Sequence, residues 1–204
     1  TYNIVKSLEK KYDCSFKNNV LIGTSFGAMA TLFVANEESK NNTLNITKYL
    51  SINPPIELVY ALNELDKNNS DWNKNSGDLK HRVGITAAKI IQTAQAKNEN
   101  NYKIETLPFT THEAKLITGF IMRQKLSDVI FTIENASKLN RTDIYDKINT
   151  LSFRDYAIKY LLKNKYKSFE DLKYDTSLHH ISHFLTNNEN YKIYHTLDDY
   201  LVNQ

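Results

Sequence analysis

The segment Val20-Leu21-Ile22-Gly23-Thr24-Ser25-Phe26-Gly27-Ala28 decides how this chain is interpreted. Its first three residues form a short apolar run, which is typical of a buried parallel strand. The apolar stretch that runs from Ala28 to Ala35 predicts a helix immediately afterwards. Between the two lies Gly23 to Gly27, which fits the pattern Gly-x-Ser-x-Gly. In a strand–turn–helix context this pattern places a serine on a tight turn.

The chemistry of this turn makes Ser25 the candidate nucleophile. Glycine at positions 23 and 27 removes Cβ atoms that would collide where strand and helix come close. The backbone N–H of Phe26 is the candidate oxyanion donor, at a helix N-terminus that favours negative charge. The alternative is an ordinary glycine-bounded turn between a strand and a helix. A phosphate-binding P-loop is excluded, because no Gly-Lys-Ser/Thr follows at the required spacing.

The whole chain divides into three parts: residues 1–55, residues 56–188 and residues 189–204. The first part is α/β, with a second buried strand from Tyr49 to Ile52. The middle part is predicted to be almost wholly helical, with polar loops at 67–78 and 97–103. The last part begins with a strand from Tyr191 to Tyr194. The predicted helices cover residues 4–12, 28–35, 58–65, 85–96, 113–133, 153–162 and 178–185, and Thr110 with Glu113 forms a capping box before the longest one.

Composition excludes several classes of protein. The chain has 204 residues, which suits one domain or one domain with a large insertion. A single cysteine, Cys14, excludes a disulfide framework. The net charge of +3 comes with only four arginines and no basic cluster, so we do not expect a nucleic-acid partner. No apolar run approaches the roughly 20 residues that a transmembrane helix needs.

The Gly-x-Ser-x-Gly turn in this setting resembles the nucleophile turn of the α/β-hydrolase superfamily. A second stretch, His195-Thr196-Leu197-Asp198-Asp199-Tyr200-Leu201-Val202, is similar to the acid loop of that superfamily, with threonine at a position that usually holds glycine. The resemblance implies that Asp199 is the catalytic acid, with Asp198 as the alternative, and that His195 is structural. The segment 107–128 also resembles the cap of a bacterial hydrolase group. The implied fold is a partial α/β-hydrolase sheet with a large, mostly helical cap insertion.

The chain departs from the superfamily mainly because it lacks the expected catalytic base. Its triad runs in the order Ser, Asp or Glu, His, and no histidine follows Asp199. Only 22 residues precede Gly23, too few for the strands that would come before it. We therefore expect an internal fragment of a longer enzyme, with little turnover by residues 1–204 alone. A sheet edge left open in such a fragment predicts homo-oligomerisation.

The histidines inside the chain are weak substitutes for the missing base. His81 and His112 precede predicted helices, and His179, His180 and His183 cluster on another. The spacing of His179 and His183 would allow a shared metal, but the Glu of an H-E-x-x-H motif is absent. We expect neither a metal nor another cofactor.

The leading hypothesis is a serine hydrolase that acts on an ester, thioester or amide, with a lipid or acyl ester as a plausible substrate. A stripe of apolar residues in the predicted cap would line an acyl pocket or simply pack between helices: Phe120, Val129, Ile130 and Phe131. The rival hypothesis is a non-catalytic pseudo-hydrolase or helical interaction module. The sequence leaves open whether the protein works in a bacterial cytoplasm or in the periplasm or at a membrane.

Overall fold

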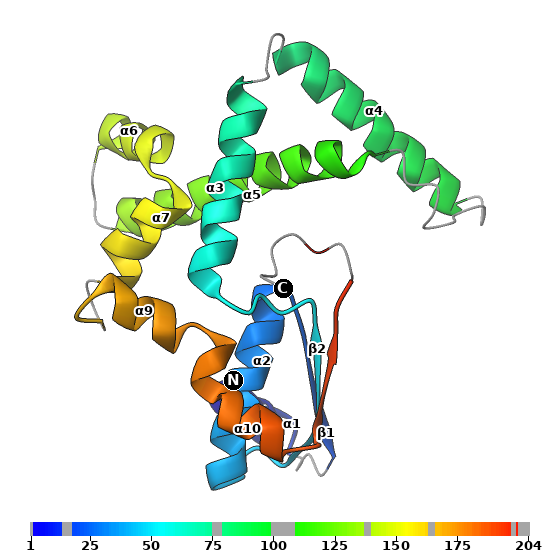
Figure 1. The fold of residues 1–204 in the computed structure, drawn as a ribbon, viewed down its shortest axis with the longest axis vertical. Coiled ribbons are helices and arrows are strands. Elements are labelled where there is room, and N and C mark those ends of the chain that lie inside the picture. The colour runs from blue at the N-terminus through cyan, green and yellow to red at the C-terminus, as the bar shows by residue number, and fades with distance from the viewer. Residues whose placement is uncertain are drawn as a thin grey trace. The chain divides into compact units, whose positions relative to one another are not determined.

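The computed structural model describes residues 2–13, 18–74, 79–98, 109–136, 140–162 and 166–196, together with Asp199. Helices dominate these residues, and three strands form one small parallel sheet (Figure 1). The predicted α/β class is confirmed at this level. The chain divides into two compact units. A sheet unit comprises residues 1–61 and 160–204, and a helical unit comprises residues 62–159.

The sheet contains the three predicted strands. They are β1 (Asn19–Thr24), β2 (Ile46–Ile52) and β3 (Tyr191–Tyr194), in the spatial order β1-β2-β3. Both pairings are parallel. All three strands therefore end at one edge of the sheet, and the loops that follow them gather there.

Helix α2 (Phe26–Asn41) connects β1 to β2 and packs on one face of the sheet. It is longer than predicted, because the helix continues through the polar residues that follow Ala35. The buried cluster beneath it joins Ala35, Tyr49 and Phe184. Two apolar side chains of β1 that alternate with the half-buried Leu21 stay accessible to solvent, since Val20 is 53% exposed and Ile22 is 59% exposed.

Shorter helices also belong to the sheet unit: α1 (Tyr2–Tyr12), α9 (Phe169–Asp175), a 3-10 helix (Leu178–Ile181) and α10 (Ser182–Asn187). The single helix predicted over 178–185 is therefore two helices. Ser177 caps the first of them by accepting a hydrogen bond from the amide of His179, 3.2 Å away. Residues 56–58 pair with residues 176–178 through two backbone hydrogen bonds, which fasten this helical segment to the chain after β2.

The helical unit contains α3 (Leu58–Lys74, which begins in the sheet unit), α4 (Leu79–Asn98), α5 (Thr111–Ala136), α6 (Arg141–Thr150) and α7 (Phe153–Tyr156). A π-helix (Ala157–Leu162) continues α7. The predicted loop over 67–78 is wrong for residues 67–74, which are helical, and residues 75–78 lie outside the described residues. Residues 97 and 98 also end a helix instead of opening a loop, while 99–103 lie outside the described residues. Leu65 and Asn68 of α3 lie three positions apart, on one face of the helix, and both are buried. Packing of this face therefore stabilises α3 even though its second half is polar in composition.

The capping box predicted before α5 is confirmed. The amide of Glu113 donates to Thr110 Oγ1 at 3.1 Å, and the amide of Thr110 donates to the Glu113 carboxylate at 2.8 Å. The Lys89 ammonium also binds Glu113 and links α4 to α5. These contacts, led by Lys89, lower the pKa of Glu113 to about 2. No helix within the described ranges is both long and apolar enough to cross a membrane.

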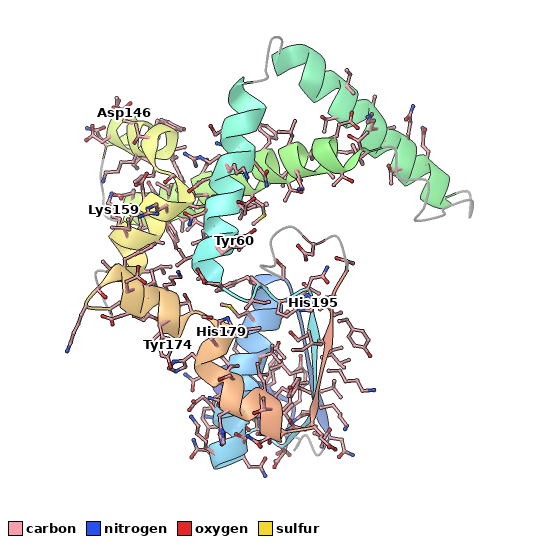
Figure 2. All side chains as sticks on the ribbon, viewed as in Figure 1. Tyr60, Asp146, Lys159, Tyr174, His179 and His195 are labelled. Carbon is pink, nitrogen blue, oxygen red and sulfur yellow. The ribbon has the colours of Figure 1, made fainter. Side chains whose placement is uncertain are left out.

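Glu134 on α5 is a buried carboxylate that two lysines share. It is 5% exposed, and its oxygens lie 2.7 Å from Lys147 Nζ on α6 and 3.2 Å from Lys159 Nζ on the π-helix (Figure 2 labels Lys159). Asp66 on α3 makes a comparable link, because its carboxylate accepts the amides of Phe153 and Arg154 at the start of α7. These carboxylates hold neighbouring helical segments of the unit together.

Replacing Glu134 by glutamine is expected to destabilise the helical unit by about 1–2 kcal/mol. The neutral amide loses two ion pairs, while the lysines, which are 33% and 39% exposed, regain part of their hydration. Urea unfolding followed by circular dichroism measures the change. Asp128→Asn on the same helix is the matched control, because the Lys125–Asp128 pair is exposed and 3.9 Å long, and its loss should change stability by less than about 0.5 kcal/mol. Equal effects of the two variants would contradict the assignment.

Candidate active site

Ser25 lies between β1 and α2 in a backbone conformation that non-glycine residues rarely adopt. Its φ is 52° and its ψ is −123°. Such a conformation costs of the order of 1–3 kcal/mol and persists only where the surrounding structure enforces it. Here the amide of Ser25 donates to the carbonyl of Ile52 at 2.9 Å, and the Ser25 carbonyl accepts the amides of Ala28 and Met29. The residue is held between the end of the sheet and the first turn of the helix.

Other serines at helix starts cap their helices with a side-chain hydrogen bond, which Ser25 does not. Ser152, Ser168 and Ser177 are extended, with φ between −81° and −143°, and each side chain accepts a backbone amide of its own helix. This is the usual behaviour of an N-cap serine. Ser25 occupies the equivalent position before α2, yet its hydroxyl makes no capping hydrogen bond and the residue is exposed. The unusual backbone therefore presents the hydroxyl to solvent instead of to the helix.

Gly23 is required by the close approach of β1 and α2. A Cβ atom at this position would lie 2.2 Å from the carbonyl oxygen of Gly27 and 2.4 Å from Thr31 Oγ1. Gly27 differs, because a Cβ atom added there would meet nothing within 4 Å. The prediction that both glycines relieve a collision therefore holds for Gly23 only. Gly27 has space for a larger residue.

The start of α2 provides hydrogen-bond donors beside Ser25. The first N–H groups of a helix have no partner within the helix, and its N-terminus carries partial positive charge. Phe26 is the first residue of α2, and its side chain is 57% exposed. Its backbone N–H stays the candidate oxyanion donor.

Asn53 connects the ends of β2 and β3, a role that was not predicted. Its amide donates to the carbonyl of Tyr194 at 2.7 Å. Its side chain accepts the amide of Thr196 at 2.9 Å and donates to Thr196 Oγ1 at 3.2 Å. Asn53 also has a positive φ of 50°, which asparagine tolerates better than most residues. In the sequence, Asn53 is only an asparagine that directly follows a predicted strand. That pattern indicates that the strand ends there, and it does not indicate a contact with Thr196.

The predicted acid loop follows β3 at this same edge. Figure 2 places His195 at the end of β3, where the chain turns into Thr196. The amide of Asp199 donates to the Thr196 carbonyl at 3.2 Å, so Asp199 lies one turn beyond the Asn53 contact. Asp198, the alternative acid, lies outside the described residues. One hydrogen-bonded path thus runs from Ser25 through Ile52 and Asn53 to the loop that carries Asp199.

The described histidines of the sheet unit are exposed, and two of them have other contacts. His180 lies 3.6 Å from the Asp175 carboxylate and packs edge-on against Tyr174. His183 Nδ1 lies 3.2 Å from the side-chain amide of Asn187. His179 lies in the 3-10 helix (Figure 2). Within the ranges that the structure describes, no group of three or more metal-binding side chains is found.

Replacing Asn53 by alanine is expected to destabilise the sheet unit by about 2 kcal/mol. The change removes both side-chain hydrogen bonds to Thr196 and puts alanine in a left-handed conformation. Asn42→Ala is the matched control, because Asn42 has a φ of 42° at the end of α2 and should lose only about 1 kcal/mol. Asn53→Gly keeps the backbone conformation and removes the contacts. Hydrogen exchange at the Thr196 amide should accelerate in both Asn53 variants and not in Asn42→Ala; unchanged exchange would remove Asn53 from this role.

Comparisons with protein-family models, with curated proteins and with solved structures find no match to this chain.

Proposed function

We propose that this chain carries the nucleophile and the acid of a serine hydrolase of the α/β-hydrolase type, with Ser25 as the nucleophile. The single observation that carries the proposal is the conformation of Ser25, which exposes its hydroxyl on a strained turn instead of using it to cap α2. Strained backbone conformations at non-glycine residues cluster at active sites and other functional positions. The parallel strand before it and the helix after it are the setting in which Gly-x-Ser-x-Gly has this meaning.

The chemistry follows from the groups at the carboxyl edge of the sheet. Ser25 Oγ would bond to the carbonyl carbon of an ester, thioester or amide, and its proton would pass to a general base. The electron pair displaced onto the carbonyl oxygen would be stabilised by the Phe26 N–H and the N-terminus of α2. The base would then protonate the leaving group, and water would release the acyl group from Ser25.

Asp199 would position the base. In a serine triad the carboxylate accepts the Nδ1–H of the histidine and stabilises the imidazolium. Asn53 would serve as a positioning residue, because it fastens the loop that carries Asp199 to the end of β2. The base would be a histidine, and none follows Asp199 in the sequence. A lipid or acyl ester is the proposed substrate class.

A fluorophosphonate probe tests the proposal on the protein expressed from its complete reading frame. The probe bonds to activated serines, and mass spectrometry of the digested protein should place the adduct on Ser25. Ser39, exposed near the other end of α2, is the internal control and should stay unmodified. A folded protein that is unmodified at Ser25, or labelled equally at both serines, would instead support the non-catalytic alternative.

A further inference from the structure

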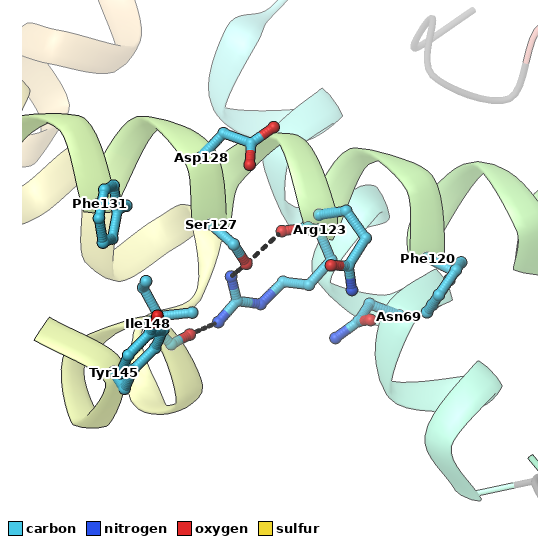
Figure 3. Close-up of a pocket in the computed structure, with 9 residues that line it drawn as sticks. Asn69, Phe120, Arg123, Ser127, Asp128, Phe131, Tyr145 and Ile148 are labelled. Carbon is cyan, nitrogen blue, oxygen red and sulfur yellow. Dashed lines mark hydrogen bonds between the residues drawn. The ribbon is translucent and has the colours of Figure 1, made fainter. Parts of the chain in front are cut away.

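The helical unit contains a pocket with Arg123 at its centre. The cavity has a volume of about 470 Å³ and lies among α3, α5 and α6 (Figure 3). This volume is within the range of small-molecule sites. The pocket forms from residues 69–148 and is thus entirely inside one unit.

Arg123 is held in place by neutral oxygens. One guanidinium nitrogen donates to Ser127 Oγ at 3.3 Å, and another donates to the backbone carbonyl of Ile148 on α6 (Figure 3). Across the described part of the chain, no carboxylate lies within ion-pair distance of this side chain. A guanidinium has five N–H donors in one plane, so these two contacts orient the group and leave further donors for a ligand.

The charges around Arg123 favour a single negative charge on the ligand. Burial lowers the pKa of Arg123 and the more distant charge of Asp66 opposes this, but an arginine stays protonated. The carboxylate of Asp66 is already bound by the amides of Phe153 and Arg154. Asp128 also lines the pocket and is exposed beside Lys125, so the described lining carries one positive and one negative charge. A dianion such as phosphate would meet an acidic group as well as the arginine.

Aromatic rings form the walls on both sides of Arg123. Phe131 of α5 and Tyr145 of α6 lie on one side, with ring centroids 6.4 Å apart, and Phe120 lies on the other (Figure 3). The predicted stripe on α5 is therefore divided: Phe120 and Phe131 line the pocket, Ile130 is fully buried and Val129 is 41% exposed. Aromatic walls bind apolar or planar groups, while a fixed guanidinium binds a carboxylate in a fork.

We propose that this pocket binds a small apolar monocarboxylate, with the carboxylate on Arg123 and the apolar group between the aromatic walls. The site is independent of Ser25 and of the proposed hydrolase activity, so each can fail without the other.

The test compares 4-phenylbutyrate with its neutral amide, 4-phenylbutanamide, and with inorganic phosphate. Calorimetry on the chain of residues 1–204 measures each affinity, and NMR of the labelled arginine Nε–H groups locates the contact. The carboxylate is expected to bind at least about tenfold more tightly than the amide, which corresponds to about 1.4 kcal/mol. It should also bind more tightly than phosphate and shift the Nε–H signal of Arg123.

Arg123→Gln should reduce the preference for carboxylate over amide to less than about twofold. Lys67→Gln removes the same charge from an exposed side chain of α3 that does not line the pocket, and it should leave the preference unchanged. Phe131→Ala should weaken both ligands equally and preserve their ratio; it keeps the test valid if Arg123→Gln fails to fold. Equal affinity for acid and amide, tighter binding of phosphate, or no binding of 4-phenylbutyrate at about 10 mM would each overturn the proposal.

Discussion

Gly23→Ala is expected to destabilise the sheet unit by about 3 kcal/mol, enough to lower the melting temperature by about 10 °C. The added methyl group would lie 2.2 Å from the carbonyl oxygen of Gly27, a backbone atom in the first turn of α2. It would also lie 2.4 Å from Thr31 Oγ1, which donates to that same carbonyl at 2.9 Å. The Thr31 hydroxyl can rotate away, but the Gly27 carbonyl belongs to the backbone of α2 and cannot move without separating α2 from β1, and so the turn that positions Ser25 would open.

Gly27→Ala is the matched control for this prediction. It adds the same methyl group four residues later, where no atom lies within 4 Å. Alanine is the better helix former, so this variant should be about 0.5 kcal/mol more stable than the original protein. Thermal and urea unfolding of both variants provide the measurement. If the two substitutions proved equally harmless, the close approach of β1 and α2 would be refuted.

Ser25→Ala should eliminate fluorophosphonate labelling and leave stability within about 0.5 kcal/mol of the original protein. Alanine removes the hydroxyl but has to adopt the same left-handed φ of 52°. Ser25→Gly should also eliminate labelling, yet it should stabilise the fold by about 1 kcal/mol because glycine adopts this conformation without strain. The opposite responses of activity and stability separate a functional serine from a structural one.

The outcome for Ser25→Gly decides between the two explanations of this turn. A structural turn selected for stability would lose stability when its serine is replaced, as is expected for an N-cap serine such as Ser152. A gain in stability combined with loss of labelling would show that the serine is retained for its chemistry. Lower stability of Ser25→Gly, measured by the same urea unfolding, would contradict the strain argument.

Local sequence patterns were sufficient to predict the strands and the cap of α5, because a short segment of the chain specifies each of them. The apolar runs at Val20–Ile22, Tyr49–Ile52 and Tyr191–Tyr194 predicted all three strands, because burial of a strand requires consecutive or alternating apolar residues. The Thr110–Glu113 pattern predicted the cap of α5 for a similar reason, since both partners lie three residues apart. In these cases the interacting residues are neighbours in the sequence.

The predictions of secondary structure were wrong where contacts with distant parts of the chain determine the local conformation. The polar composition of residues 67–74 predicts a loop, but Asn68 is buried where Gly119 of α5 crosses α3, and a Cβ at position 119 would lie 2.7 Å from Asn68 Cβ. The helix predicted over 178–185 is divided, and pairing of its first residues with residues 56–58 fastens its start. Such contacts depend on long-range packing, which a local pattern does not contain.

For the candidate site, the sequence by itself determined which residues could take part: Ser25 on a glycine-bounded turn, the Phe26 amide after it, and Asp199 after the last strand. Only the tertiary structure decided that the Ser25 hydroxyl is exposed and not a helix cap, that Gly23 and not Gly27 is sterically required, and that Asn53 connects the end of β2 to the loop before Asp199. It also decided that Arg123 lies in a pocket with aromatic walls. The physical reason is that residue types define the available chemistry, whereas backbone strain, steric fit and the surroundings of a charge depend on atoms brought together from distant positions in the chain.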